Sequence, residues 1–301
     1  MAPPHGRQPA SPVQLIARSL RPQQWTKNLL VFAGIGFSGR LLDREAWPPA
    51  VAAFLIFCGL SGAVYLINDV LDRTADAQHP IKRLRPVASG ALPPAAAIAA
   101  AAVLGAACLA AAAAVNRGLA LTAAAYVALL LAYSVALKHY VIIDVLTLAG
   151  GFVLRAVAGA VAIGVPISHW LLVCTTLLAL FLGLSKRRHE LTLLADGAAG
   201  HRPILQEYSP YLLDQMIAVV TASTLIAYSV YTISSETAER LGSDRLGLTI
   251  PFVLYGIFRY LYLVHQRQGG GSPSDMLLTD RPLLVCVALW VATVVLVIYV
   301  I

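Results

Sequence analysis

A cluster of acidic and amide side chains stands where a long apolar stretch ends. Residues 68–76 read Asn-Asp-Val-Leu-Asp-Arg-Thr-Ala-Asp. If the chain is helical there, offsets of four residues place Asn68, Asp72 and Asp76 near one face, one turn apart. Mg²⁺ takes one or two carboxylates together with substrate phosphates, so these oxygen ligands suit it. A solvated helix end would explain the same residues, but carboxylates that emerge directly from an apolar run are costly in a membrane, which favours a metal–phosphate site.

Cations follow this cluster within a few residues. Lys82, Arg83 and Arg85 lie in the segment His-Pro-Ile-Lys-Arg-Leu-Arg-Pro at 79–86. Together they can hold a diphosphate, because a guanidinium offers paired N–H donors to phosphate oxygens. The same cations could instead anchor the loop to anionic lipid. Carboxylates beside cations are the arrangement that a Mg²⁺–diphosphate site needs, and we favour that interpretation.

Further polar residues interrupt the later apolar stretches. Lys138 and Asp144 flank a short turn at the same expected membrane depth, where they could form a structural ion pair or contact substrate. Arg155 lies about three turns further along. A charged side chain there must face a polar interior, and it could bridge helices or bind substrate. Lys186 and Arg187 begin a basic run that could set topology or hold a second phosphate.

The elements that position these residues are expected to be membrane-spanning helices. Of the 301 residues, 58% are hydrophobic and only 12% are charged, about half the usual charged fraction of a soluble domain. Long Ala, Leu and Val runs differ from the short alternating segments of a membrane β-barrel. We predict an all-α integral membrane protein with nine transmembrane helices, at about 26–42, 47–68, 93–115, 118–137, 141–164, 167–185, 212–234, 247–265 and 282–301.

Charge asymmetry predicts the orientation of these helices. With nine crossings, 16 of the 22 Lys and Arg residues share the side of the N-terminus, five lie on the other side, and Arg155 lies within a span. By the positive-inside rule, the N-terminus and the polar clusters are cytoplasmic. Residues 1–22 are expected to form a disordered basic cytoplasmic tail. Residues 23–301 are expected to form a single catalytic domain whose active-site cavity opens on the cytoplasmic side.

These residues resemble the UbiA superfamily of intramembrane prenyltransferases. Asn68, Asp69, Asp72 and Asp76 stand as in that family's first aspartate motif at the end of the second span, and nine helices match its fold. The family's aromatic prenyltransferases carry a second DxxxD motif at the end of the sixth span, where this chain has Lys-Arg-Arg-His-Glu at 186–190. The basic run implies a second substrate that brings its own phosphate, as in the branch that uses 5-phosphoribosyl diphosphate and a polyprenyl monophosphate.

The resemblance implies transfer of a 5-phosphoribosyl group to a polyprenyl phosphate, with decaprenyl phosphate as the expected lipid and Mg²⁺ as the cofactor. The implied metal ligands are Asn68, Asp72 and Asp76. The implied catalytic residues are Asp69, Asp72 and Asp144, of which Asp69 or Asp144 would stabilise positive charge at ribose C1. The implied substrate-binding residues are Lys27, Asn28, Lys82, Arg83, Arg85, Tyr133, Lys138, Arg155, Lys186 and Arg187.

The resemblance also implies a multi-pass protein of a bacterial inner membrane that serves synthesis of an arabinose donor for the cell envelope. Its expected partners are the two phosphorylated substrates and the lipid bilayer, with no nucleic acid; a homo-oligomer is left open. Two other functions compete. Prenyl transfer to an aromatic acceptor is disfavoured by the missing second DxxxD motif. A lipid-phosphate transporter is disfavoured because the polar residues, apart from Arg155, gather on one side.

Overall fold

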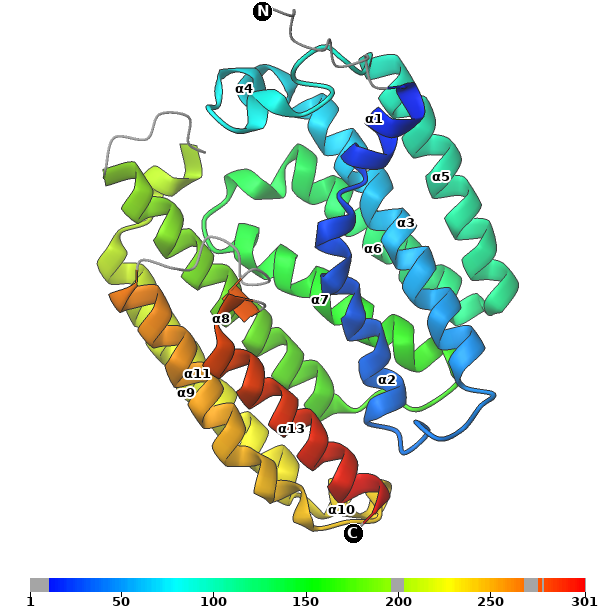
Figure 1. Cartoon of the computed structure of the whole chain (residues 1–301), viewed down its shortest axis with the longest axis vertical. Helices are drawn as coiled ribbons and strands as arrows, with labels where there is room; N and C mark the ends of the chain where they lie inside the picture. The colour runs from blue at the N-terminus through cyan, green and yellow to red at the C-terminus, as the bar shows by residue number, and fades with distance from the viewer. Residues whose placement is uncertain (1–10, 196–202, 268–275, 278, 301) are drawn as a thin grey trace, which may run out of the picture.

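Eight long apolar helices form the body of the protein (Figure 1). The computed structural model describes every residue except 1–10, 196–202, 268–275, 278 and 301. Within that part of the chain, eight helices are long and apolar enough to cross a membrane. They are α3 (Trp47–Leu71), α5 (Pro94–Val115), α6 (Arg117–Val135), α7 (Ile143–Ala162), α8 (His169–Ala195), α9 (Pro210–Ile233), α11 (Ile250–Gln266, preceded by the 3₁₀ helix η5, Arg245–Thr249) and α13 (Arg281–Tyr299). The predicted all-helical membrane architecture is therefore confirmed.

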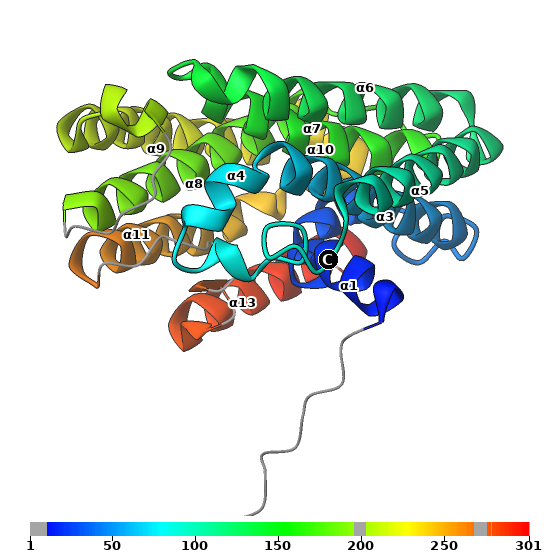
Figure 2. The same cartoon turned by 90° about the horizontal axis from the view of Figure 1, so that it is seen from above.

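Of these helices, α3 and α7 are the most buried, and both pack against α6 (Figures 1 and 2). α3 packs against α5 and α6, while α7 lies between α6 and α8; α9 packs on α8, and α11 pairs with α13. One core joins α3 to α6, where the rings of Phe57 and Tyr126 lie 4.9 Å apart. A second core joins α8 to α11 through Phe181 and Tyr260, at 5.3 Å. Because lipid solvates the outer faces, tight side-chain packing holds such helices together.

Short helices connect the long ones: α1 (Pro12–Ser19), η1 (Pro22–Phe32), α2 (Ala33–Gly36), α4 (Arg73–Gln78), η2 (Lys82–Leu84), η3 (Leu137–His139), η4 (Pro203–Glu207) and α10 (Ser235–Leu241). Helix α1 lies in the segment expected to be a disordered tail. Its N-terminus is closed by a capping box, in which the side chains of Ser11 and Gln14 accept each other's backbone N–H. Leu15 and Ile16 pack beside α3 and α5. Residues 12–19 are thus helical, which differs from the expectation.

The first predicted span is built differently from a long α-helix. Residues 22–32 form the 3₁₀ helix η1, and α2 adds only four residues. The backbone of η1 lies directly on α7, because a Cβ placed on Gly159 would fall 1.7 Å from the carbonyl oxygen of Val31. A 3₁₀ helix is narrower than an α-helix and rises about 2.0 Å per residue, so η1 extends about 22 Å. The prediction of nine long transmembrane helices is therefore not confirmed, since the described residues contain eight.

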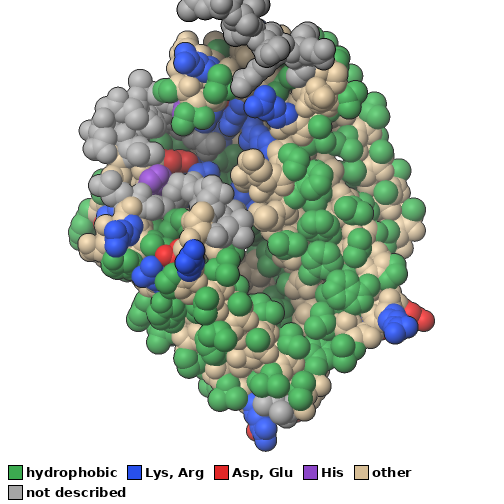
Figure 3. Space-filling model, in the orientation of Figure 1, with side chains coloured by type: hydrophobic (Ala, Val, Ile, Leu, Met, Phe, Trp, Pro, Cys, Tyr) green, Lys and Arg blue, Asp and Glu red, His purple; other side chains and the backbone are tan. Residues whose placement is uncertain are grey.

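Charged side chains gather at one end of the bundle (Figure 3). The helices α3, α6, α8 and α11 end there, and α5, α7, α9 and α13 begin there. In Figure 3 blue and red side chains border a hollow in the upper half of the visible face, whereas the lower half is almost entirely apolar. The opposite end carries a few surface pairs, such as Arg40 with Asp43 at 2.9 Å. The predicted one-sided polarity is therefore a feature of the three-dimensional structure.

Replacing Gly159 by alanine should lower the thermal stability of the detergent-solubilised protein, because the added methyl group would collide with the backbone of Val31. We expect a loss of about 1–3 kcal/mol, the usual cost of overpacking. Gly105→Ala is the matched control: Gly105 also lies inside a helix, but a Cβ there meets nothing within 4 Å. That variant should melt at or slightly above the wild-type temperature. Equal melting temperatures for wild type and Gly159→Ala would contradict the close contact of η1 with α7.

Candidate active site

The carboxylate of Asp72 lies at the end of α3 and is held by two side chains. Helix α3 ends at Leu71, and Asp72 forms the junction with α4. The amide Nδ2 of Asn68 donates to Asp72 Oδ2 at 2.9 Å, and Lys138 Nζ donates to Oδ1 at 2.6 Å. Lys138 belongs to η3, which follows α6, so this ion pair links the ends of two helices that are far apart in the sequence.

Asp69 and Asp76 form a second group on the other side of the same segment. Both are buried, and both pair with Arg85 from the loop after α4: Nη1 lies 3.2 Å from Asp69 Oδ1 and 2.5 Å from Asp76 Oδ2. Arg21 also pairs with Asp69, and its guanidinium lies over the ring of Tyr65, 4.7 Å from the centroid. Arg21 stands just before η1, so the N-terminal segment and the loop converge on one buried carboxylate.

The ligands predicted from the sequence, Asn68, Asp72 and Asp76, therefore fall into two groups with different partners. Asn68 and Asp72 face Lys138, whereas Asp76 joins Asp69 around Arg85. The reason is the junction at Asp72, whose φ of −90° and ψ of 5° interrupt the helical register between α3 and α4. Sequence spacing assumes a continuous helix, and the helix is not continuous here.

A third group is centred on Asp144 at the start of α7. Asp144 Oδ2 accepts from Arg187 Nε at 2.8 Å, and both side chains are almost completely buried. Arg187 also donates to Glu190 Oε2 at 2.6 Å and to the Tyr133 hydroxyl at 3.3 Å. The alternative of an ion pair between Lys138 and Asp144 is wrong, because Lys138 pairs with Asp72 and Asp144 pairs with Arg187. Membrane depth, which suggested that pair, does not fix the direction of a side chain around its helix.

Tyr208, which the sequence analysis missed, completes the third group. Its hydroxyl donates to Asp144 Oδ1 at 2.8 Å and accepts from the backbone N–H of Ile142 at 2.7 Å. Burial raises the pKa of Tyr208 to about 12, and the neighbouring Asp144 carboxylate adds to the shift. The phenol therefore stays protonated at neutral pH and remains a donor to Asp144. Tyr208 lies between η4 and α9, in a segment with no motif that would have singled it out.

Arg155 and Asn28 form a buried polar bridge deeper in the bundle. Arg155 Nε donates to Asn28 Oδ1 at 2.7 Å, and its Nη groups donate to the Gly151 carbonyl at 2.9 Å and the Tyr126 hydroxyl at 2.6 Å. Asn28 Nδ2 in turn donates to Ser61 Oγ at 3.1 Å. Of the two interpretations left open for Arg155, these contacts support helix bridging, since they join η1, α3, α6 and α7.

The remaining predicted residues are basic and lie on three elements. Lys27 precedes Asn28 on η1, Lys82 and Arg83 belong to η2, and Lys186 lies on α8 with its Nζ 3.9 Å from Glu190. Arg83 is exposed to solvent. Arg188, next to Arg187, points instead to α9, where it pairs with Asp214 at 2.5 Å. The basic run of α8 therefore serves two different neighbours.

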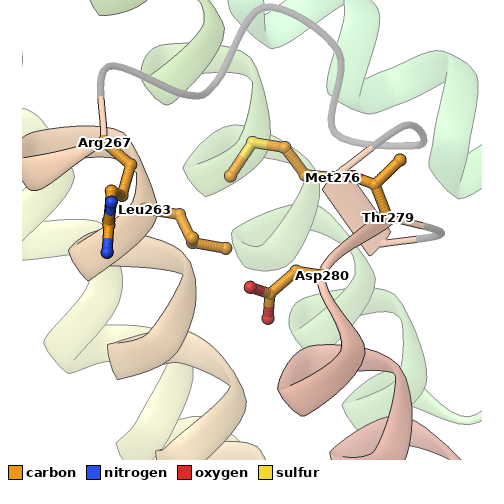
Figure 4. A pocket seen from close by; sticks show the side chains of 5 residues that line it. All are labelled: Leu263, Arg267, Met276, Thr279 and Asp280. Carbon is orange, nitrogen blue, oxygen red and sulfur yellow. The ribbon is translucent and has the colours of Figure 1, made fainter.

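A small pocket lies apart from these groups, between the end of α11 and the start of α13 (Figure 4). Its lining includes Leu263, Met276 and Asp280, and the Asp280 carboxylate faces the space between the two helices. Asp280 also accepts from the Leu283 backbone N–H at 2.9 Å and pairs with Arg259 at 2.8 Å, which lowers the pKa of the carboxyl group. These bonds show that Asp280 caps α13 and ties it to α11.

The donor atoms at the end of α3 suit a hard divalent cation only when a substrate completes the set. Among the described side chains, no three His, Cys, Asp or Glu residues form a group that would hold a metal ion by themselves. The structure places these oxygen ligands in two groups at the end of α3: Asn68 with Asp72, and Asp76 with Asp69. Mg²⁺ usually keeps several waters and binds only one or two carboxylates together with substrate phosphates, so either group is chemically suited to it.

The helical fold and the acidic and basic side chains at its polar end are those of an integral membrane enzyme. The chain belongs to the UbiA prenyltransferase family, whose model matches residues 29–279. It is 32% identical to a decaprenyl-phosphate phosphoribosyltransferase of Mycolicibacterium smegmatis, over 97% of this chain and 95% of that protein. It is 35% identical to a decaprenyl-phosphate phosphoribosyltransferase of Mycobacterium tuberculosis, over 95% of each chain.

A solved structure shares this fold. It is that of a UbiA homolog from Archaeoglobus fulgidus bound to GPP and Mg²⁺, with a TM-score of 0.70 and 21% sequence identity. The match covers 95% of this chain and 100% of that chain. The family model and the sequence relatives confirm the predicted membership of the UbiA family, and the solved structure shows a shared fold.

Replacing Arg155 by lysine should destabilise the protein, although the charge is kept. A single ammonium group cannot reach the three acceptors that the planar guanidinium holds, so at least one buried acceptor would lose its partner. We expect a loss of about 1–3 kcal/mol in the free energy of unfolding. Arg117→Lys, at an exposed position on α6, is the matched control and should leave stability unchanged. Equal thermal stability of Arg155→Lys and wild type in detergent would contradict the bridging role.

Proposed function

We propose that the protein transfers the 5-phosphoribosyl group from 5-phosphoribosyl diphosphate to a polyprenyl phosphate such as decaprenyl phosphate, and releases diphosphate. The observation that carries this proposal is the buried cation Arg187 at the end of α8, in a site whose α3 carboxylates face cations from several elements. Two phosphorylated substrates bring several negative charges, so their site needs more cations than its own carboxylates neutralise. The near-full-length similarity to enzymes named decaprenyl-phosphate phosphoribosyltransferase supports the same reaction.

The donor diphosphate is proposed to bind at the junction of α3 and α4. Asn68, Asp72 and Asp76 would hold Mg²⁺, which neutralises charge on the departing diphosphate when bound. Arg85 pairs with Asp76, and Lys138 pairs with Asp72. Both cations would therefore lie close to a phosphate bound through Mg²⁺ to these carboxylates. Lys82 and Arg83, from the same loop as Arg85, would add further contacts to the donor.

The chemical step joins an acceptor phosphate oxygen to ribose C1 while the bond between C1 and the diphosphate oxygen breaks. The acceptor phosphate is ionised at neutral pH, so the reaction needs no general base. Positive charge that develops at C1 would be stabilised by the negative potential of the nearby carboxylates. Since Asp69 pairs with Arg85 and Asp144 pairs with Arg187, we propose that these carboxylates also aim the two guanidinium groups at substrate.

The acceptor phosphate and the ribose 5-phosphate are proposed to share the remaining cations. Lys27 on η1 and Lys186 and Arg187 on α8 would make these contacts, together with Lys138 of η3 beside the donor site. Tyr133 contacts Arg187 from α6. The polyprenyl tail would leave sideways between helices into the lipid. Asn28 and Arg155 would support this region from below, through the buried bridge that holds η1 in place.

Prenyl transfer to an aromatic acceptor is the second candidate. The fold likeness to a homolog bound to GPP and Mg²⁺ is compatible with it, but at 21% identity that likeness extends only to the fold. The second DxxxD motif expected of aromatic prenyltransferases is replaced by residues 186–190, of which Arg187 is a buried cation. This replacement favours phosphoribosyl transfer.

The assay that tests the proposal combines purified protein, Mg²⁺, 5-phosphoribosyl diphosphate and decaprenyl phosphate, and detects the phosphoribosylated lipid. Asp72→Asn should reduce turnover by about 100-fold or more, because the amide cannot supply the charge that a bound Mg²⁺ requires. Asp43→Asn, which alters an ion pair at the opposite end of the bundle, should retain wild-type activity. Wild-type protein that makes no such lipid but consumes a prenyl diphosphate with an aromatic acid would reverse the assignment.

We also propose that the polar end of the bundle faces the cytoplasm, and that η1 and α2 form a ninth, narrow crossing. In a background without the four native cysteines, Ser89→Cys should be labelled by a membrane-impermeant maleimide only after the cells are opened. Ser235→Cys, exposed at the opposite end on α10, should be labelled in intact cells whose outer layers admit the reagent. The reverse pattern would show that the site faces outward.

A further inference from the structure

Two residues other than glycine have a positive φ in the described part of the chain, and both lead to a buried aspartate. Arg21, with φ of 52°, pairs with Asp69. Ile142, with φ of 70°, donates its backbone N–H to the hydroxyl of Tyr208, which in turn donates to Asp144. A β-branched residue in this region is strained, and such strain persists only where the surroundings enforce it, commonly at functional sites.

Tyr208 links three segments that are distant in the sequence. It follows η4 and precedes α9, yet its hydroxyl lies at the start of α7, where it accepts from Ile142 and donates to Asp144. The side chain of Tyr208 is buried, and its raised pKa keeps the phenol protonated. The direction of both hydrogen bonds is therefore fixed: the strained backbone N–H orients the hydroxyl, and the hydroxyl proton orients the carboxylate.

Both oxygens of Asp144 are occupied by this arrangement. Oδ1 accepts from Tyr208 and Oδ2 accepts from Arg187 Nε, while the residue itself is completely buried. Asp144 is thus better placed to hold Arg187 than to contact a substrate. The Arg187 guanidinium gives one N–H each to Asp144, Glu190 and Tyr133 out of the five that it carries. Glu190 is the partner of Arg187 that reaches solvent, with its side chain 24% exposed.

We infer that Tyr208 is a positioning residue for the proposed reaction: through Asp144 it fixes the orientation of Arg187, which binds the phosphate of one of the two substrates. This inference rests on the proposed function. Glu190 marks where that phosphate would lie, because its partly exposed carboxylate pairs with Arg187 and lies 3.9 Å from Lys186 Nζ. A phosphate that replaces Glu190 there meets a guanidinium that is already aimed.

The alternative is that Tyr208 only fastens η4 to α7. In that case loss of the hydroxyl would lower the thermal stability. It would change the kinetic constants for the substrates only to the extent that the fold is loosened. The two roles differ in the kinetic constant that they affect and in what rescues the variant. Positioning through Arg187 affects the binding of the one phosphate that Arg187 contacts, whereas loosening affects both substrates.

The test is Tyr208→Phe, which removes the hydroxyl and keeps the ring, with Tyr211→Phe as the control on an exposed residue three positions further along the chain. With the control and wild type equally active, Tyr208→Phe should raise the KM for one of the two substrates about 10-fold, since it removes a hydrogen bond to a charged group. The KM for the other substrate should change less than about two-fold. Asp144→Asn should raise the same KM, and the double variant should be no worse than Asp144→Asn alone.

Ile142→Gly separates the two roles, because glycine adopts a positive φ without strain. Added to Tyr208→Phe, it should restore thermal stability but leave the KM raised. Recovery of both would show a purely structural role and overturn the inference. Equal rises in both KM values, or additive effects of Tyr208→Phe and Asp144→Asn, would overturn it as well. Absence of turnover in wild type and in Tyr211→Phe would instead overturn the proposed function itself.

Discussion

The burial of charge in an apolar bundle is the constraint on which the rest of this site depends. Asp69, Asp76 and Asp144 are all almost inaccessible to solvent, and each is met by at least one guanidinium. An unpaired ion in such surroundings would cost several kcal/mol, so each buried carboxylate needs a cation, whichever part of the chain supplies it. These cations come from the segment before η1, from the loop after α4 and from the end of α8. The ion pairs thereby determine which parts of the chain meet at the polar end.

The same pairing prepares the site for phosphates. A guanidinium that is held by a buried carboxylate loses little freedom when an anion arrives, so binding is favoured over what a mobile surface cation would give. Arg85 is held in this way by Asp69 on α3, and Arg187 by Asp144 at the start of α7. This arrangement supports a reaction in which two anionic groups must be brought together at one ribose carbon.

Close packing of backbone against backbone supplies the second constraint. The contact of η1 with Gly159 brings Asn28 within reach of Arg155, and that bridge is then buried among α3, α6 and α7. A regular α-helix would be wider and shorter for the same number of residues. The 3₁₀ form of η1 therefore follows from the space that α7 leaves, and it carries the residues that follow Arg21 down the face of the bundle (Figure 1).

Much of this architecture was determined by the sequence itself, because a bilayer imposes long apolar helices and pushes charges to their ends. The long helices and the gathering of polar residues at one end could be predicted on that basis, although nine long helices were expected and the described residues contain eight. The family was predicted separately, from the motif of Asn68, Asp72 and Asp76. Tertiary structure alone decided which charges meet, since distance along a helix fixes depth but not direction around the axis. Lys138 thus pairs with Asp72 rather than Asp144, and the interrupted helix at Asp72 turns Asp76 toward Arg85. Tyr208 reaches Asp144 only because the fold brings η4 to the start of α7, a contact between segments 64 residues apart that no local pattern encodes.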